Sequence, residues 1–107
     1  MRIFVLSTCD TCRKALKELR AAGHAPEVID IRKDGIGPGD LAAMLDAFGD
    51  RAVNRASATW RGLDEGQRAR PAAELIAGSP TLLKRPVIER DGAWLQGWSA
   101  ATRAALL

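Results

Sequence analysis

Residues 2–19, RIFVLSTCDTCRKALKEL, decide the fold of this chain, because the period of the apolar residues changes within them. The apolar run at 3–6 predicts a short buried strand over residues 2–6, and a polar turn follows it. From Cys12 onward the apolar residues recur at helical spacing, with charged residues on the other face. The junction between the predicted strand and the predicted helix carries both cysteines of the chain, Cys9 and Cys12.

The pattern continues outward as a β-α-β unit. Gly23 is a stop signal for the first helix, and the apolar run at 28–31 predicts a second strand. Because a helix connects the two strands, we expect them to run parallel. Residues 34–39 contain three glycines and predict a loop. Asp40 is then predicted to cap a second amphipathic helix that ends before Gly49.

The middle of the chain carries a weaker signal. Residues 50–63 show no clean period and are predicted to be irregular. A helical segment is expected to begin near Asp64, to be interrupted by Pro71, and to end at Gly78. The three tryptophans are expected to close the core.

The last third of the chain predicts a hairpin and a helix. Two short strand-like runs, 87–90 and 93–96, are separated by Asp91 and Gly92, a strong two-residue hairpin signal. Ser99 is predicted to cap a final short helix. The whole order is β-α-β, then helices, then β-β-α. We therefore predict an α/β protein with a thioredoxin-like fold and a helical insertion between its two halves.

Length and charge limit the classes of protein. With 107 residues we expect a single domain, 1–107, with the insertion at about 38–80. Sixteen Lys and Arg against thirteen Asp and Glu give a net charge of +3, and the basic residues are scattered. No direct nucleic-acid partner is expected, since phosphate binding favours a clustered basic face. No apolar run suits a signal peptide or a membrane span, so we expect a cytoplasmic protein without a membrane partner.

The cysteine pair is the main chemical signal. In a reducing compartment, a C-x-x-C pair is catalytic, redox-sensing or metal-binding. Structural zinc needs two further ligands, and the chain offers one histidine, His24, and no second pair, so no metal is expected. Cys9 is expected just before a helix, where unpaired amides and the helix dipole lower a thiol pKa. Cys12 lies one turn on, where it is either a resolving thiol or an inert core residue.

A resemblance to a known family gives these residues a role. The chain resembles the ArsC/Spx/YffB family over nearly all of its length, in four stretches with the family's order and spacing. They are CDTCRKA at 9–15, NRASATW at 54–60, LLKRPVI at 82–88 and QGW at 96–98.

The resemblance implies site residues. Cys9 matches the nucleophilic cysteine, and Arg55 and Arg85 match two arginines that hold an oxyanion or thiol substrate beside it. Arg13 matches a basic residue in the first helical turn. From the sequence alone Pro86 is best read as an ordinary trans proline that opens a strand. The resemblance instead implies a cis Pro86 that lies against the active cysteine.

Two departures weaken the arsenate reductase interpretation. A third arginine after the final strand is replaced by the stretch at 96–98, and Val5 and Leu6 stand where those enzymes carry a histidine. The middle of the chain resembles the YffB-type thiol reductases most closely. The implied function is therefore a glutathione-linked thiol-disulfide oxidoreductase, or an arsenate reductase-like enzyme, that binds no cofactor and uses glutathione as co-substrate.

The implied partners are glutathione or glutaredoxin, with a small oxyanion or a disulfide as substrate. An alternative from the same family is an Spx-like transcription regulator. It would bind RNA polymerase and respond to a Cys9–Cys12 disulfide switch.

Overall fold

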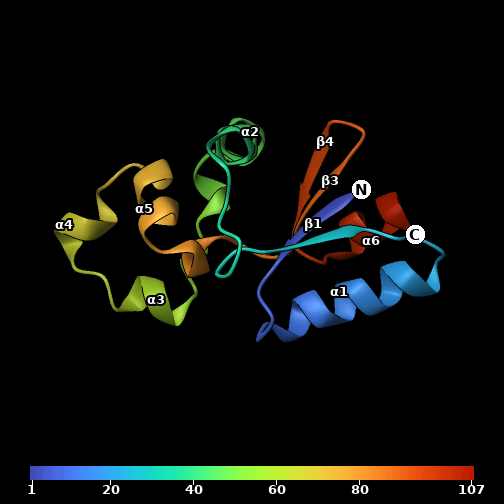
Figure 1. The fold of residues 1–107 in the computed structure, drawn as a ribbon. Helices are drawn as coiled ribbons and strands as arrows, with labels where there is room; N and C mark the ends of the chain where they lie inside the picture. The colour runs from blue at the N-terminus through green and yellow to red at the C-terminus, as the bar shows by residue number, and fades with distance from the viewer. The chain divides into compact units, whose positions relative to one another are not determined.

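The computed structural model describes residues 1–107, which form two compact units. The first unit comprises Met1–Asp34 and Arg85–Leu107, and the second comprises Gly35–Lys84. Figure 1 traces the chain through both. The prediction that residues 1–107 are one domain stays a prediction, because each unit is compact by itself. In the first unit the elements are β1 (Arg2–Val5), α1 (Asp10–Ala21), β2 (Glu27–Asp30), β3 (Val87–Arg90), β4 (Ala93–Gln96) and α6 (Ala100–Leu106).

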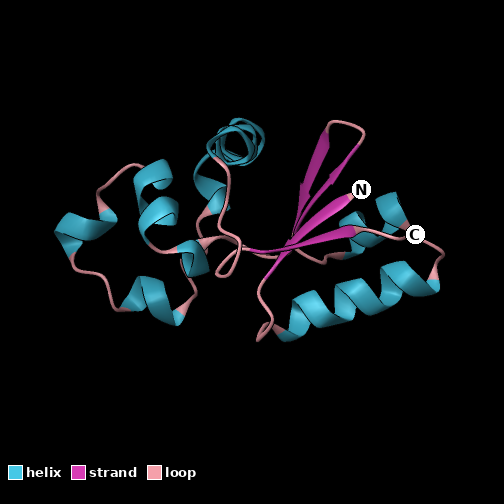
Figure 2. Ribbon diagram, in the orientation of Figure 1, coloured by secondary structure: helices cyan, strands magenta, loops and turns pink.

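The first unit contains a four-stranded sheet in the order β2-β1-β3-β4 (Figure 2). Strand β1 pairs in parallel with β2, as the β-α-β pattern predicts. On its other side β1 pairs antiparallel with β3, and β3 pairs antiparallel with β4. The strand order and the helices match the predicted thioredoxin-like fold.

One face of this sheet is covered by α1 and α6. Along β1 the side chains alternate, so every second residue points toward these helices. Helix α1 contributes residues at positions three and four apart, which is the spacing of one helical face. The buried cluster is made by Ile3, Val5, Cys12, Ala15, Leu19, Ile88 and Leu106. None of the helices combines the length and apolar character that crossing a bilayer requires.

The other face of the sheet carries an aromatic pair. Phe4 and Trp94 stack with ring centroids 5.8 Å apart. The guanidinium of Arg2 lies 5.4 Å from the Phe4 centroid and 5.7 Å from that of Trp94. These distances are within the range of cation–π attraction. Phe4 is fully buried, whereas Trp94 is half-buried.

Helix α1 ends as the sequence predicts. Gly23 has φ +92°, a backbone conformation that glycine adopts without steric cost. Its amide donates to the carbonyl of Arg20, and the amide of His24 donates to the carbonyl of Leu19. These two bonds form a Schellman motif that closes the helix.

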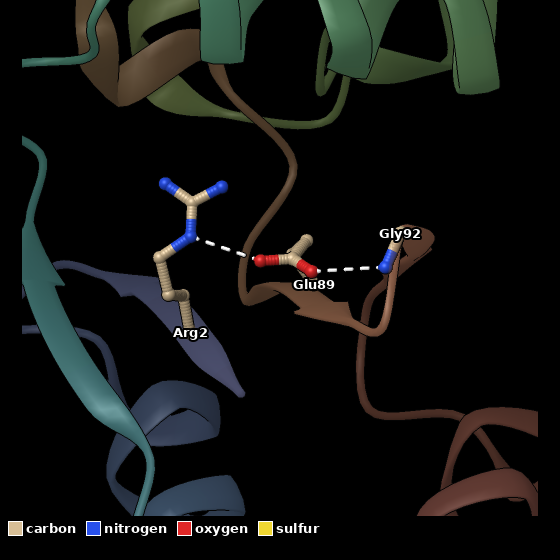
Figure 3. Close-up of polar contacts among 3 residues, drawn as sticks. All are labelled: Arg2, Glu89 and Gly92. Carbon is tan, nitrogen blue, oxygen red and sulfur yellow. Dashed lines mark hydrogen bonds and ion pairs between the residues drawn. The ribbon is translucent and has the colours of Figure 1, made fainter.

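The hairpin between β3 and β4 also agrees with the prediction. Asp91 and Gly92 both have positive φ, 51° and 83°, as a two-residue type I′ turn requires. Glu89 connects this turn to the sheet. Its carboxylate accepts hydrogen bonds from Arg2 Nε at 2.9 Å and from the Gly92 amide at 3.1 Å (Figure 3). The final helix begins at the N-cap Ser99, whose hydroxyl accepts from the Thr102 amide.

The second unit is helical. Its elements are α2 (Pro38–Phe48), the 3-10 helix η1 (Gly49–Ala52), α3 (Ala58–Arg61), α4 (Glu65–Arg68), α5 (Ala72–Gly78) and the 3-10 helix η2 (Pro80–Leu82). Helix α2 packs against η1 and α5. Val53, after η1, forms an isolated antiparallel bridge with Leu83, near the end of the unit. The Asn54 amide donates to the Leu82 carbonyl at 2.7 Å beside it.

Two predictions in this unit are wrong. Helix α2 begins earlier than expected, with Gly37 as its N-cap and Pro38 in its first turn, so Asp40 does not cap it. Proline is favoured there because its missing amide would have had no helical partner. Residues 50–63 are not irregular throughout, since α3 lies within them and is capped by the Ser57 hydroxyl. A helix of one turn is too short to show an amphipathic period.

The predicted start near Asp64 and the interruption at Pro71 are confirmed. Asp64 and Gln67 form a capping box at the start of α4. Helix α5 begins directly after Pro71. All three tryptophans are half-buried: Trp98 packs against the core cluster of the first unit, as predicted, whereas Trp60 and Trp94 are not part of it.

The Glu89 interactions predict a pH-dependent contribution to stability. The Gly92 amide and then Arg2 hold the pKa of Glu89 below its ordinary value. We expect Glu89→Gln to lower the free energy of unfolding by about 0.5–1 kcal/mol at neutral pH. A lowered carboxyl pKa stabilises the folded state above the ordinary pKa, and this stability is lost as pH falls through the lowered value. The difference between wild type and variant should therefore shrink in acid.

Urea denaturation at neutral and acidic pH measures this difference. Glu27→Gln, which removes an exposed carboxylate from β2, is the control with the same change in charge. An equal loss of stability in both variants, or one that persists in acid, would contradict the assignment.

Candidate functional site

Cys9 lies where β1 passes into α1. It occupies the N-cap position of the helix with extended backbone angles, φ −90° and ψ 115°. Its amide donates to the Leu6 carbonyl at 3.0 Å, and its carbonyl accepts from the Arg13 amide at 3.1 Å. These bonds fix the short loop on both sides of the cysteine. The thiol is half-buried, so an incoming group can reach it.

Cys12 has the opposite environment. It lies one turn into α1 on the face that packs against the sheet, and it is 1% exposed. Burial, together with the neighbouring Cys9 thiol, raises the pKa of Cys12 to about 12. At neutral pH this thiol stays protonated, and it is a hydrogen-bond donor beside Cys9.

The Cys9 thiol is activated by these neighbours. Burial alone would raise its pKa, because a thiolate loses solvation. Hydrogen bonds from the Cys12 side chain and backbone and from the Arg85 side chain, with the Arg85 charge, outweigh this effect and lower the pKa of Cys9. Sulfur is a weak hydrogen-bond acceptor, and the Cys9 side chain makes no standard N-cap hydrogen bond to α1.

Arg85 reaches Cys9 through the sheet topology. Strand β3 runs antiparallel to β1, with Val87 opposite Phe4, so the residues before β3 lie beside the end of β1. The bond between Arg85 and Pro86 is cis, as the resemblance implies. Pro86 is fully buried, and its carbonyl accepts from the Gly97 amide at 2.8 Å. The first unit thus brings together Cys9, Cys12 and Arg85.

Arg13 is placed differently. Its guanidinium is exposed and forms an ion pair with Asp10 across one helical turn. It lies in the first turn of α1, as the resemblance implies, but its charge is partly balanced there.

Arg55 belongs to the second unit. Its guanidinium lies 5.5 Å from the centroid of the Trp60 ring. The guanidinium of Arg68 lies 5.3 Å from the same centroid and donates to the Trp60 carbonyl. Sequence analysis missed Arg68, because an arginine eight residues beyond the tryptophan belongs to none of the four stretches.

A polar contact between α1 and the C-terminal region was also missed. Glu18 accepts a hydrogen bond from Trp98 Nε1 through one carboxylate oxygen. Its other oxygen accepts from Arg103 Nη2 at 3.0 Å. Trp98 and Arg103 lie 80 and 85 positions after Glu18, so no local sequence pattern could reveal the contact. It ties α1 to α6 and to the turn after β4.

Metal ligands do not gather anywhere in the structure: no group of three or more His, Cys, Asp or Glu side chains is placed to hold an ion.

Comparison with known proteins gives four concordant matches. Residues 4–105 match the ArsC family. An uncharacterised protein of Haemophilus influenzae is 37% identical over 102 residues, which cover 91% of this chain and 90% of that protein. A solved structure described as the YFFB protein is 34% identical with a TM-score of 0.89, covering 98% of this chain and 96% of its own. An arsenate reductase-related protein from Brucella melitensis is 33% identical with a TM-score of 0.76, covering 98% and 93%.

The contact between Arg85 and Cys9 predicts the effect of removing the guanidinium. Arg85→Met takes away a hydrogen bond and a positive charge that favour the thiolate, so the pKa of Cys9 should rise. The direction follows because both the hydrogen bond and the charge of Arg85 favour the ionised form. Thiolate absorbance in the ultraviolet, or the pH dependence of alkylation, measures this rise in the Cys12→Ser background.

Arg90→Met is the matched control, because Arg90 lies at the opposite end of β3 and pairs with Asp91. Arg85→Lys should restore part of the effect, since it keeps the charge. An unchanged or lower pKa in Arg85→Met would show that the arginine does not stabilise the thiolate.

Proposed function

This chain belongs to the ArsC family, and on that premise we propose that it is a glutathione-linked thiol-disulfide oxidoreductase with Cys9 as its nucleophile. One observation carries the proposal. Cys9 is half-buried at the start of α1, and its pKa is lowered by Cys12 and Arg85. A thiolate is the reactive form of cysteine, and such helix-terminal positions are typical of catalytic thiols.

The reaction begins at a mixed disulfide between a substrate thiol and glutathione. The Cys9 thiolate attacks the glutathione sulfur, and the disulfide bond of the substrate breaks. The substrate leaves as a thiolate and takes a proton from water, while Cys9 and glutathione form a new disulfide. A second glutathione thiolate then attacks the glutathione sulfur of this adduct. Glutathione disulfide is released and the Cys9 thiolate is regenerated.

The environment of Cys12 supports a second glutathione, rather than Cys12, as the resolving thiol. Only a thiolate attacks a disulfide, and the pKa of Cys12 is raised to about 12 by burial. The same side chain is 1% exposed within the core of the first unit. We assign Cys12 the role of a hydrogen-bond donor that stabilises Cys9 as a thiolate and as a leaving group.

The arginines have the chemistry to hold the anionic part of glutathione. Guanidinium keeps its charge at all relevant pH values and pairs with carboxylate through two parallel hydrogen bonds. Arg85 is beside Cys9 in the first unit. By the family resemblance we assign Arg55 and Arg13 the same task. The resemblance also places the ring of Pro86, which is buried, against the reacting sulfur.

Three cysteine variants test the mechanism. Cys9→Ser should reduce turnover of a glutathione mixed disulfide to the uncatalysed rate. Cys12→Ser should retain most of the activity, because its hydroxyl still donates toward Cys9. Cys12→Ala should lower the rate at neutral pH by up to roughly tenfold, because the pKa of Cys9 rises when the donor is lost. Glutathione-coupled NADPH consumption measures all three.

A Cys12→Ser variant as inactive as Cys9→Ser would instead make Cys12 the resolving thiol. A parallel assay with arsenate separates the two family activities. Reduction of arsenate to arsenite consumes two electrons from two glutathione molecules and yields glutathione disulfide and water. Turnover of arsenate but not of the mixed disulfide would replace the proposed substrate class.

A second candidate function, the redox-switched regulator, is favoured by the contact between the two thiols. Cys12 follows Cys9 by three residues at the start of α1, and its side chain lies beside that of Cys9, as disulfide formation requires. If this function holds, RNA polymerase subunits should be retained by the protein in one redox state and not in the other. The Cys9→Ser variant, which forms no disulfide, should bind equally in both. Retention in neither state would remove this candidate.

A further inference from the structure

The solvent face of α1 is basic. Lys14, Lys17 and Arg20 are exposed along this helix, whereas Cys12 and Leu19 face the core. Successive residues of an α-helix are rotated by about 100°, so these three cations lie within about 120° of arc opposite the buried face. We call the surface of Lys14, Lys17 and Arg20 the basic face of α1.

The acidic residues of α1 are paired with groups other than these three cations. Asp10 pairs with Arg13 in the first turn. Glu18 is engaged from both of its oxygens, by Trp98 and Arg103. The ion pairs of the structure include none of Lys14, Lys17 and Arg20. Three cations of one helix are thus left to interact with something outside the chain.

The basic face begins at the nucleophile. Cys9 is the N-cap of the same helix, and Figure 1 shows α1 leading away from the loop that follows β1. With a rise of 1.5 Å per residue, Lys14 is about 8 Å and Arg20 about 16 Å along the axis from Cys9. Both distances are fixed by one rigid element of the first unit. A group bound along this face therefore has a defined position relative to the reacting sulfur.

We propose that the basic face of α1 binds an acidic segment of a protein substrate whose glutathionylated cysteine is attacked by Cys9. The inference rests on the proposed function and names its substrate class. Three cations spread over about 9 Å of helix axis extend beyond glutathione held at Cys9, whereas a peptide with several carboxylates spans them. Charge complementarity of this kind acts mainly on association rate and on the choice of partner.

A protein segment fits this surface better than a nucleic acid does. Asp10 is highly exposed beside Cys9, with 90% of its side chain accessible. A regular phosphate backbone that approaches Cys9 along α1 would meet this carboxylate at close range. A peptide can place its acidic residues against Lys14, Lys17 and Arg20 and a neutral residue against Asp10.

The chemical step is the one already described, with the protein as the leaving group. Cys9 attacks the glutathione sulfur of the protein mixed disulfide, and the protein thiolate leaves and is protonated by water. Glutathione then supplies the electrons that regenerate Cys9.

The experiment compares three probes, each of which carries a mixed disulfide with glutathione. One is a synthetic peptide with a glutathionylated cysteine followed by several Glu residues, and the second is the same peptide with Lys in their place. The third is the small mixed disulfide of glutathione and 2-mercaptoethanol. We expect kcat/KM for the acidic peptide to exceed that for the basic one by roughly tenfold at low ionic strength, at about two- to fivefold per exposed charge pair. High salt should remove most of this preference.

Charge reversal provides the decisive comparison. K14E/K17E/R20E should prefer the basic peptide, and its activity on the small disulfide should equal that of wild type. Lys17→Glu alone should lower the preference for the acidic peptide by about two- to fivefold. Arg90→Glu makes the same change in net charge on the β3–β4 hairpin and should leave the preference unchanged.

The outcomes separate this inference from the proposed function. Absence of turnover with the small disulfide would refute the proposed function itself. Normal turnover of the small disulfide with equal kcat/KM for both peptides would overturn the basic face as a substrate site and leave the reductase intact. Tight binding of duplex DNA that K14E/K17E/R20E abolishes, without a peptide preference, would overturn it in favour of a nucleic acid.

Discussion

The packing of α1 against the sheet is the interaction on which the rest of the first unit depends. Cys12, Ala15 and Leu19 are buried against Ile3, Val5 and Ile88, and this contact fixes the direction of the helix axis. Because Cys9 is the N-cap, the same contact places its sulfur at the positive end of the helix. It also fixes which side of α1 faces water, and so where its cations lie. The Glu18 contacts with Trp98 and Arg103 hold α1 to α6 from a second side.

The two cysteines show how one short motif acquires two different thiols. Both belong to the same helical turn, yet Cys9 is half-buried and Cys12 is fully buried. Burial opposes ionisation at both positions. At Cys9 the hydrogen bonds from Cys12 and Arg85 outweigh it, whereas at Cys12 burial and the neighbouring thiol act in the same direction. The pair is therefore better described as a nucleophile and its hydrogen-bond donor than as two equivalent redox partners.

The second unit shows where sequence patterns have little power. Helices α3 and α4 are each four residues long, so their caps, Ser57 and Asp64, carry more information than their apolar spacing. The helix start near Asp64 was predicted, but Asp40 was mistaken for a cap because it lies three residues after Gly37, within the first turn. Trp60 was expected in the core. Its ring instead contacts the guanidinium groups of Arg55 and Arg68, and only the folded chain brings Arg68 to it.

The sequence by itself determined the order of elements, the parallel pairing of β1 and β2, the hairpin at Asp91 and Gly92, and the position of Cys9 before a helix. These features depend on residues close together in the chain, where apolar period and turn chemistry are sufficient. The cis bond before Pro86 was implied only by family resemblance, since both isomers are compatible with the local sequence. Tertiary structure alone decided which thiol is activated. The burial of Cys12 and the approach of Arg85 to Cys9 arise from the antiparallel pairing of β1 and β3, segments more than 80 residues apart.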